Sequence, residues 1–187
     1  MRPFRVARLA VHDRTDFDCG VPALNGYLQQ QASQDMRRHA AACFVLIENS
    51  TDAIAGYYTL SAASVGLADL PLATQKRMPR YPTVPALRIG RLAMDARFQG
   101  RKLGGVLLID AIRRAHAADL GIAVVVVDAK HEQAAAFHQH HSFQPLSADR
   151  RTWFLPMSEA VKNLLGRSPQ QKPGEETAVT TTSASPA

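Results

Sequence analysis

Cysteine is scarce in this chain of 187 residues, in which only Cys19 and Cys43 occur. Two cysteines are too few for a disulfide framework, and their spacing is not that of a metal-ligand pair. We therefore expect both to be reduced thiols in or near the core, without a chemical role. The histidines around His138 do not supply three converging ligands for zinc either, so no metal site is predicted.

Long apolar runs are also missing. The longest uninterrupted one covers residues 40–47 and is far too short to cross a bilayer. Residues 1–13 alternate arginines with apolar residues and contain no continuous apolar stretch of the kind that a secretory signal needs. The sequence therefore predicts a cytoplasmic protein that does not enter a membrane.

Acidic residues are nearly absent between Pro71 and Lys102, where Asp95 is the only one. The same window holds eight basic residues, which gives it a balance of +7 against +6 for the whole chain. Each of these basic side chains alone is adequately explained as a solvated surface residue. Together they favour a polyanionic partner, either a phosphate-bearing cofactor or RNA.

The composition predicts one folded domain and a tail. An apolar content of 46% is enough for a core, and a charged content of 20% keeps such a domain in solution. Residues 166–187 are rich in Ser, Thr, Pro, Gln and Glu, and Val179 is their only large apolar residue. We therefore expect a domain over residues 1–165 and a disordered tail over 166–187.

Hydrophobic periodicity predicts an alternation of strands and helices within the domain. We expect strands over residues 4–9, 42–48, 53–63, 87–94, 122–127, 143–146 and 152–155, and helices over 22–32, 72–77, 104–118, 131–140 and 157–165. The continuous β-branched run at 122–127 indicates a strand that is covered on both faces. The fold class is therefore α/β (α+β), with a mixed central sheet flanked by helices.

The segment from Arg88 to Asp110 is the most informative one, because it predicts a strand, a glycine-bearing loop and a helix N-terminus in succession. The first turn of such a helix has unpaired N–H donors and the positive end of the helix dipole, so it suits a pyrophosphate. The loop is neither a P-loop nor a Rossmann turn, since both glycine patterns are absent. A loop of this kind also occurs without any ligand, and that alternative stays open at this point.

The loop order Gln99-Gly100-Arg101-Lys102-Leu103-Gly104 resembles the Gln/Arg-x-x-Gly-x-Gly/Ala signature of the GNAT N-acetyltransferases. Gln99 and Gly104 match the signature, whereas Lys102 takes the place of its first glycine. A lysine there is compatible with backbone binding if its φ is negative, and it adds a cation near the phosphates. The resemblance covers about Arg2 to Leu165.

Three further segments, 17–28, 56–60 and 84–95, resemble in combination the TacT-type GNAT toxins of bacterial toxin–antitoxin pairs. The resemblance implies an enzyme that uses acetyl-CoA to acetylate the α-amino group of aminoacyl-tRNA and thereby blocks translation. It also implies a ribbon-helix-helix antitoxin as partner, and it leaves a homodimer open. The residues implied to bind acetyl-CoA are Leu92, Ala93, Met94, Gln99, Gly100, Arg101, Lys102, Leu103, Gly104 and Gly105.

The position of the catalytic acid is where this chain departs from the resembling family. The family has Phe-Tyr-x-x-x-Gly-Phe on its last helix, whereas this chain has Phe137-His138 and then Ser142-Phe143. His138 thus stands where the tyrosine would protonate the thiolate of CoA, but its reference pKa of ~6.5 leaves it mostly deprotonated at pH 7. His138 is a working acid with a lower pH optimum, another group or water replaces it, or the enzyme is impaired. Ser142 in place of glycine requires a backbone outside the left-handed region.

The acceptor side is predicted from basic and aromatic residues. Arg77, Arg80, Arg88 and Arg91 are the candidates for RNA or CoA phosphates. Tyr57 and Tyr58 are neighbours on one expected strand, so they point to opposite faces, one to the core and one to the acceptor cleft. Two alternatives to aminoacyl-tRNA acetylation remain at this level: an acetyltransferase for a small amine or a protein N-terminus, and an impaired module that binds only CoA or an antitoxin.

Overall fold

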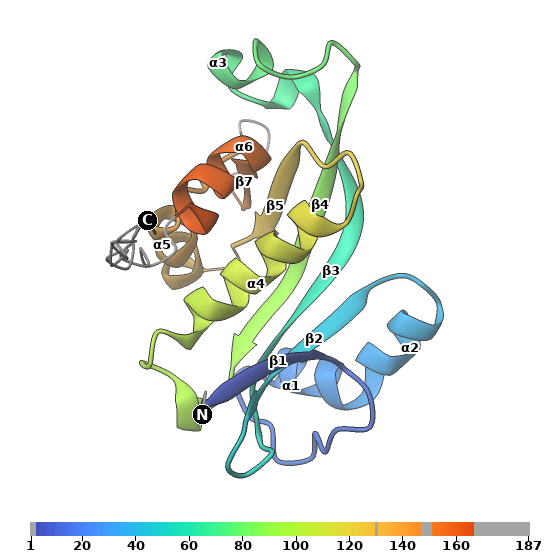
Figure 1. Ribbon diagram of the computed structural model, residues 1–187, viewed down its shortest axis with the longest axis vertical. Helices are drawn as coiled ribbons and strands as arrows, with labels where there is room; N and C mark the ends of the chain where they lie inside the picture. The colour runs from blue at the N-terminus through green and yellow to red at the C-terminus, as the bar shows by residue number, and fades with distance from the viewer. Residues whose placement is uncertain (1–2, 130, 147–150, 167–187) are drawn as a thin grey trace, which may run out of the picture.

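The computed structural model describes residues 3–129, 131–146 and 151–166 (Figure 1). The expected tail over 166–187 lies outside the described residues, apart from Gly166. Within the part of the chain that is described, no helix is both long and apolar enough to span a membrane.

A seven-stranded mixed sheet forms the centre of the molecule, with the strand order β1-β2-β3-β4-β5-β7-β6. Within the residues described, β4 and β5 are the one parallel pair, and the other neighbouring strands are antiparallel. This confirms the predicted mixed sheet. The strands are β1 (Phe4–Arg8), β2 (Ala42–Glu48), β3 (Ile54–Gly66), β4 (Thr83–Met94), β5 (Val124–Asp128), β6 (Gln144–Pro145) and β7 (Thr152–Pro156).

Helices lie on both faces of this sheet. The longest, α4, runs along the sheet in front of β3, β4 and β5, whereas α1 and α2 lie together beside β1 and β2 (Figure 1). The expected helix after Pro22 is divided into three parts, because a π-helical segment interrupts it. The helices are α1 (Pro22–Gly26), η1 (Tyr27–Gln31), α2 (Ala32–Arg37), η2 (Leu67–Asp69), α3 (Leu72–Gln75), η3 (Ala96–Phe98), α4 (Leu103–Ala117), α5 (Glu132–His140), α6 (Met157–Ala160) and η4 (Val161–Leu165).

Three hydrophobic clusters pack against the sheet, a large one under α4 and two smaller ones on the opposite face. Tyr58 belongs to the core under α4, with Leu107, Leu108 and Ile112. Tyr57 belongs to the opposite core, which α1 and η1 cover with Leu28 and their neighbours. Both tyrosines are completely buried, so the expectation that one of them faces an acceptor cleft is wrong. The two tyrosines do point to opposite faces, as strand alternation requires, but each face is covered by helices.

The two cysteines fit this arrangement. Cys43 is buried completely and Cys19 almost so, and both are free thiols in the core beneath α1. Burial raises the pKa of the Cys43 thiol to about 12, which keeps it protonated and unreactive at neutral pH. The prediction of reduced core thiols is confirmed.

The antiparallel pair of β3 and β4 is longer than its apolar pattern predicts. It continues to the pairs Val65 with Val84 and Gly66 with Thr83. The strand predicted over 53–63 continues to Gly66, and the strand predicted over 87–94 begins at Thr83. The pair therefore extends as an arm that carries η2 and α3 at its far end, at the top of Figure 1.

Candidate functional site: a strand fork beside a helix N-terminus

The two parallel strands diverge near the middle of the sheet. β4 pairs with β5 only from Ala86 to Ile89, opposite Val124 to Val127, although β4 continues to Met94. Beyond Ile89 one edge of β4 therefore has no strand partner within the described residues. We call this opening the fork.

A β-bulge marks the start of the fork. On β3, Thr59 lies opposite Arg91 and Leu60 lies opposite Ile89, which leaves Gly90 without a partner residue. A side chain at position 90 would come within 3.3 Å of the Thr59 hydroxyl oxygen, so glycine suits the bulge. Bulges bend a strand and increase its twist, which explains why β4 leaves β5 at this point.

Backbone donors line the open edge of β4. The Asp95 N–H points to β3, because it donates to the Ala55 carbonyl at 2.9 Å. Successive N–H groups of a strand alternate between its edges, so those of Met94 and Leu92 point into the fork, and that of Ala93 points to β3. Two of the three backbone positions predicted to bind the cofactor thus face the opening.

The loop after β4 leads directly into the first turn of α4. This turn has no side-chain cap, and within the described residues no acceptor is bonded to the N–H groups of Leu103, Gly104 or Gly105. A 15-residue helix presents the full positive end of its dipole there. Arg101 and Lys102 are exposed beside the turn and add two cations. The arrangement is able to bind a diphosphate through main-chain donors.

The loop backbone differs from the sequence prediction at one residue. Gly100 has a φ of +74°, and Lys102 also has a positive φ, +59°. The condition set for Lys102, a negative φ, is therefore not met. A side chain with a Cβ costs roughly 1–2 kcal/mol in the left-handed region. The chain thus accepts strain at the position where the family signature has glycine.

Two glycines allow α5 to approach the start of α4 closely. A Cβ atom on Gly104 would lie 3.4 Å from the Phe137 ring, and one on Gly105 would lie 3.2 Å from Nε2 of His141. The Nδ1 atom of His141 is 2.8 Å from the Phe137 carbonyl oxygen. The aromatic end of α5 is consequently held against the same helix turn that offers the free N–H groups.

His138 lies on α5 and is buried, with only 6% of its surface exposed. Its Nδ1 atom has no hydrogen-bond partner within the described part of the chain. Burial, and secondarily the neighbouring His141, lower the pKa of His138 to about 4, while Asp128 acts in the opposite direction. The imidazole is therefore neutral at pH 7, so it is not the charged acid that the sequence analysis considered first.

The end of α5 is a Schellman motif. The Phe143 N–H donates to the His138 carbonyl at 3.1 Å, and the Ser142 N–H donates to the Gln139 carbonyl at 3.0 Å. Ser142 has a φ of +69°, so the expectation that it avoids the left-handed region is wrong. The motif closes the helix with a serine where glycine would be unstrained, and it places Phe143 in the core.

The buried carboxylate of Asp95 holds the loop after β4 to the segment before α1. Asp95 accepts from the backbone N–H groups of Asp18 and Arg97 and from the Arg97 guanidinium. Burial alone would raise the pKa of Asp95, but these hydrogen bonds hold it below its usual value. The side-chain amide of Gln99 adds a second link, because it donates to the carbonyls of Cys19 and Met94.

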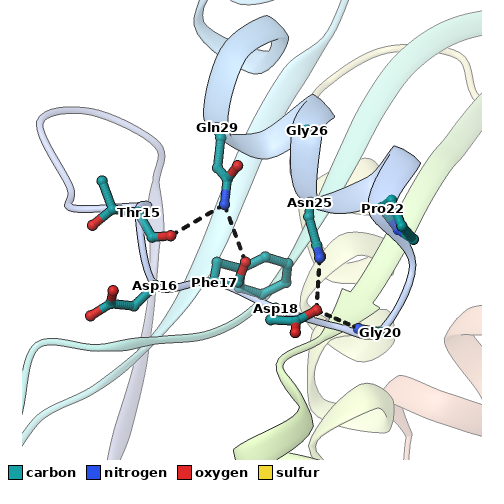
Figure 2. A pocket seen from close by; sticks show the side chains of 9 residues that line it. All are labelled: Thr15, Asp16, Phe17, Asp18, Gly20, Pro22, Asn25, Gly26 and Gln29. Carbon is teal, nitrogen blue, oxygen red and sulfur yellow. Dashed lines mark hydrogen bonds between the residues drawn. The ribbon is translucent and has the colours of Figure 1, made fainter.

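The segment before α1 is held by its own polar side chains. Figure 2 shows Asn25 donating to Asp18 and Gln29 donating to the carbonyls of Thr15 and Phe17. These residues line a hollow of about 590 Å³. Its polar groups are thus largely satisfied within the segment. The residues that carry the toxin-like pattern at 17–28 therefore brace the loop at the end of β4.

The structure does not bring the four candidate arginines together. Arg77 and Arg80 lie on the arm, where Arg77 forms an ion pair with Glu159 at 3.5 Å. Arg88 and Arg91 lie on β4 beside the fork. Arg88 forms an ion pair with Asp128 at 2.5 Å, and the Arg91 guanidinium lies 3.5 Å above the Tyr27 ring.

The sequence analysis missed two features of the site. One is the bulge at Gly90, and the other is Asp128, which ends β5 and pairs with Arg88 from β4. An aspartate directly after a run of β-branched residues was the available signal for the second. Among the described residues, no group of three or more His, Cys, Asp or Glu side chains is placed to hold a metal ion.

Comparisons with known proteins agree with this geometry. The model of the acetyltransferase (GNAT) family matches residues 8–143. A tRNA-acetylating toxin of Mycobacterium tuberculosis (strain ATCC 25618 / H37Rv) is 37% identical over 150 residues, which are 79% of this chain and 88% of that protein.

Two solved structures of another toxin, AtaT, have the same fold. AtaT complexed with acetyl-methionyl-tRNAfMet is 29% identical, with a TM-score of 0.79, over 87% of this chain and 99% of that chain. A tyrosine-to-phenylalanine mutant of AtaT, bound to the C-terminus of the antitoxin AtaR and to acetyl-CoA, is 25% identical, with a TM-score of 0.73, over 89% of this chain and 100% of that chain. The fork, the uncapped glycine turn and the family match lead to one conclusion: this chain belongs to the GNAT acetyltransferase family.

Proposed function

We propose that this protein is a toxin that transfers the acetyl group of acetyl-CoA to the α-amino group of aminoacyl-tRNA and so blocks translation. The observation that carries the proposal is the fork between β4 and β5, placed directly before the uncapped first turn of α4. The relatives with related sequences, a tRNA-acetylating toxin and AtaT with its acetylated tRNA, support this choice of acceptor.

The donor side uses main-chain groups. The diphosphate of acetyl-CoA binds the loop and helix turn formed by Gln99, Gly100, Arg101, Lys102, Leu103, Gly104 and Gly105. The pantetheine arm then follows the open edge of β4, where the N–H groups of Leu92 and Met94 face the fork. The residues fit this cofactor because the turn offers unbonded donors and adjacent cations, and no metal is required.

The reaction depends more on the positioning of the amine than on a strong base. An α-amino group has a reference pKa of ~7.7–8.0, so part of it is neutral at cellular pH. In the transfer, a bond forms between the amine nitrogen and the acetyl carbon, and the carbon–sulfur bond breaks. The amine loses a proton and CoA leaves as the thiol, so the chain's main task is to hold the amine against the fork.

We assign His138 a role as a hydrogen-bond donor toward the departing sulfur. A neutral imidazole keeps one N–H, which stabilises developing negative charge without complete proton transfer. The buried, unpartnered Nδ1 supports this role, since an orphaned polar atom in such a place needs a partner that arrives with the ligand. Water or the amine itself then supplies the proton.

The tRNA contacts divide into two groups. Arg88 and Arg91 lie at the fork and are suited to the acceptor end of the tRNA, whereas Arg77 and Arg80 on the arm are suited to backbone phosphates farther away. We also infer an antitoxin partner of the ribbon-helix-helix class and a cytoplasmic location. The AtaT structure with AtaR supports the antitoxin in general terms.

The test is transfer of labelled acetyl from acetyl-CoA to bulk charged tRNA, with release of the CoA thiol measured in parallel. Uncharged tRNA and small amines serve as alternative acceptors. We expect transfer to charged tRNA only, with an apparent affinity that falls steeply with salt because several phosphate contacts are lost. Equal transfer to small amines would contradict the tRNA assignment, and no binding of acetyl-CoA at millimolar concentration would contradict the whole proposal.

A further inference from the structure

The fork has an ion pair at its base, on the face opposite to α4. Val124 and Val126 of β5 lie in the cluster with Val84 and Phe154, whereas Val125 and Val127 lie in the core under α4. By strand alternation, Asp128 lies on the face that Val124 and Val126 share. Arg88 is on the same face as Ala86, and its guanidinium meets the Asp128 carboxylate at 2.5 Å.

This face leaves part of β4 and β5 beside the fork accessible within the described residues. The α4 face is filled by the large core around Leu107, Leu108 and Ile112. On the opposite face, the β3 and β4 residues between the two smaller cores are half-exposed, namely Ser61, Arg88, Gly90 and Arg91. An acceptor that reaches the fork from this face passes Arg88 and Asp128.

The Asp128 carboxylate is placed to receive hydrogen bonds there. Its side chain is 33% exposed. One oxygen accepts from Arg88, and the other accepts from the Thr152 hydroxyl at 3.2 Å. A carboxylate has about four acceptor sites, so capacity remains on both oxygens. Asp128 directly follows Val127, the last residue of β5 that pairs with β4, so it lies at the point where the two strands part. Its negative charge also raises the pKa of His138, against the larger effect of burial.

We propose that Asp128, aligned by Arg88, is the amine-binding residue of the acceptor site: its carboxylate receives the N–H groups of the α-amino group of an aminoacyl ester and directs that nitrogen into the fork. The inference rests on the proposed function and names the group in this chain that recognises the amine. A carboxylate serves an amine in either protonation state, because both forms donate N–H hydrogen bonds.

A purely structural role is the competing explanation for this pair. Ion pairs that are about one-third exposed on both sides contribute little to stability. We therefore expect Asp128→Asn to fold, which a thermal melt verifies. If the ion pair only holds β5 against β4, then Arg88→Gln and Asp128→Asn should change the affinities for charged and uncharged tRNA in the same way.

The experiment measures the affinity of the chain for charged and for uncharged tRNA, without acetyl-CoA so that no turnover occurs. In the unaltered protein, charged tRNA should bind more tightly. Asp128→Asn should reduce this difference about tenfold, since a hydrogen bond to a charged group is lost, and should leave the affinity for uncharged tRNA unchanged. Arg88→Gln should lower the affinities for charged and uncharged tRNA by the same factor, so that the ratio between the two affinities stays the same. The exposed Asp119→Asn is the matched control, for which no change is expected.

A second measurement requires no variant. The unaltered chain should bind tRNA that carries a 2-hydroxy acid less tightly than tRNA that carries the corresponding amino acid. Equal affinities for these two tRNAs, or an unchanged difference between charged and uncharged tRNA in Asp128→Asn, overturn the inference. Acetyl transfer by the unaltered chain would still stand in that case, whereas an absence of transfer overturns the proposed function instead.

Discussion

The hydroxyl of Tyr58 on β3 donates a 2.6 Å hydrogen bond to the carboxylate of Asp110 on α4. The tyrosine is completely buried, and Asp110 also accepts from Arg114 at 2.8 Å. This link fixes α4 along the sheet, and through it the position of the helix turn beside the fork. Burial, followed by the hydrogen bond to Asp110, raises the pKa of Tyr58 far above its usual value, so the hydroxyl remains a donor at neutral pH.

The first prediction concerns this link. Tyr58→Phe should lower the free energy of unfolding by about 1–2 kcal/mol, because Asp110 loses a buried donor while the ring packing is kept. Denaturant unfolding monitored by circular dichroism measures the loss. Tyr81→Phe is the matched control, since Tyr81 is 67% exposed, and it should be neutral. An equal effect of the two substitutions would show that the Asp110 bond contributes nothing.

The second prediction concerns the left-handed serine at the end of α5. Ser142→Gly should increase the free energy of unfolding by roughly 0.5–1 kcal/mol, because relief of left-handed strain exceeds the added entropy of an unfolded glycine. Ser158→Gly, at an exposed position inside α6, should decrease it. Stability that falls in both variants would contradict the Schellman geometry around Ser142.

Strands with a continuous apolar run could be predicted from the sequence, whereas strand ends made of small residues could not. The strand at 42–48 was predicted to the residue, because a continuous apolar run between polar ends marks a strand buried on both faces. Residues 64–66 of β3 and 83–86 of β4 were not predicted as strand, since small residues such as Ser64 acquire strand structure from their partner strand rather than from their own pattern. Local sequence is a weak guide to such pairing.

In the candidate site, features that are contiguous in sequence could be predicted, whereas those that depend on tertiary packing could not. The glycine-bearing loop and the helix after it could be predicted, because they are contiguous in sequence, whereas the binding of a diphosphate there stays a prediction. The ion pair of Arg88 with Asp128 joins residues 40 positions apart, and it depends on where β4 and β5 part. The burial of His138 and its lowered pKa also follow from tertiary packing, which no spacing of residues along the chain reveals.

The third prediction is the pH dependence that follows from His138. Its pKa is about 4 in the folded chain against the usual 6.5 of a histidine, so the unfolded state binds more protons between these values. Stability from this group is complete above pH 6.5 and is lost as the pH falls toward 4, by up to roughly 3 kcal/mol. His138→Phe should flatten the profile of unfolding free energy in this range. His140→Gln, at an exposed position, should leave the profile unchanged, and a slope that survives in His138→Phe would contradict the assignment.

The fourth prediction separates the two roles considered for position 138. His138→Ala should reduce the turnover number about ten- to hundredfold, because one hydrogen bond to a developing charge is lost. His138→Tyr should equal or exceed the unaltered enzyme, since a phenol is able to transfer its proton completely. Thiol release with charged tRNA measures both. An inactive unaltered chain that gains activity only with tyrosine would instead identify an impaired enzyme.

The fifth prediction tests the cofactor turn through its second glycine. An alanine Cβ at position 105 would lie 3.2 Å from Nε2 of His141, so either the imidazole or the first turn of α4 must shift. Gly105→Ala should therefore weaken acetyl-CoA binding about tenfold, as expected when a charge-assisted hydrogen bond to a phosphate is displaced. Titration calorimetry measures the affinity. Gly121→Ala is the matched control, because nothing lies within 4 Å of its added Cβ. Equal affinities of the two variants would mean that the diphosphate does not depend on this turn, and the donor site would have to be sought elsewhere along β4.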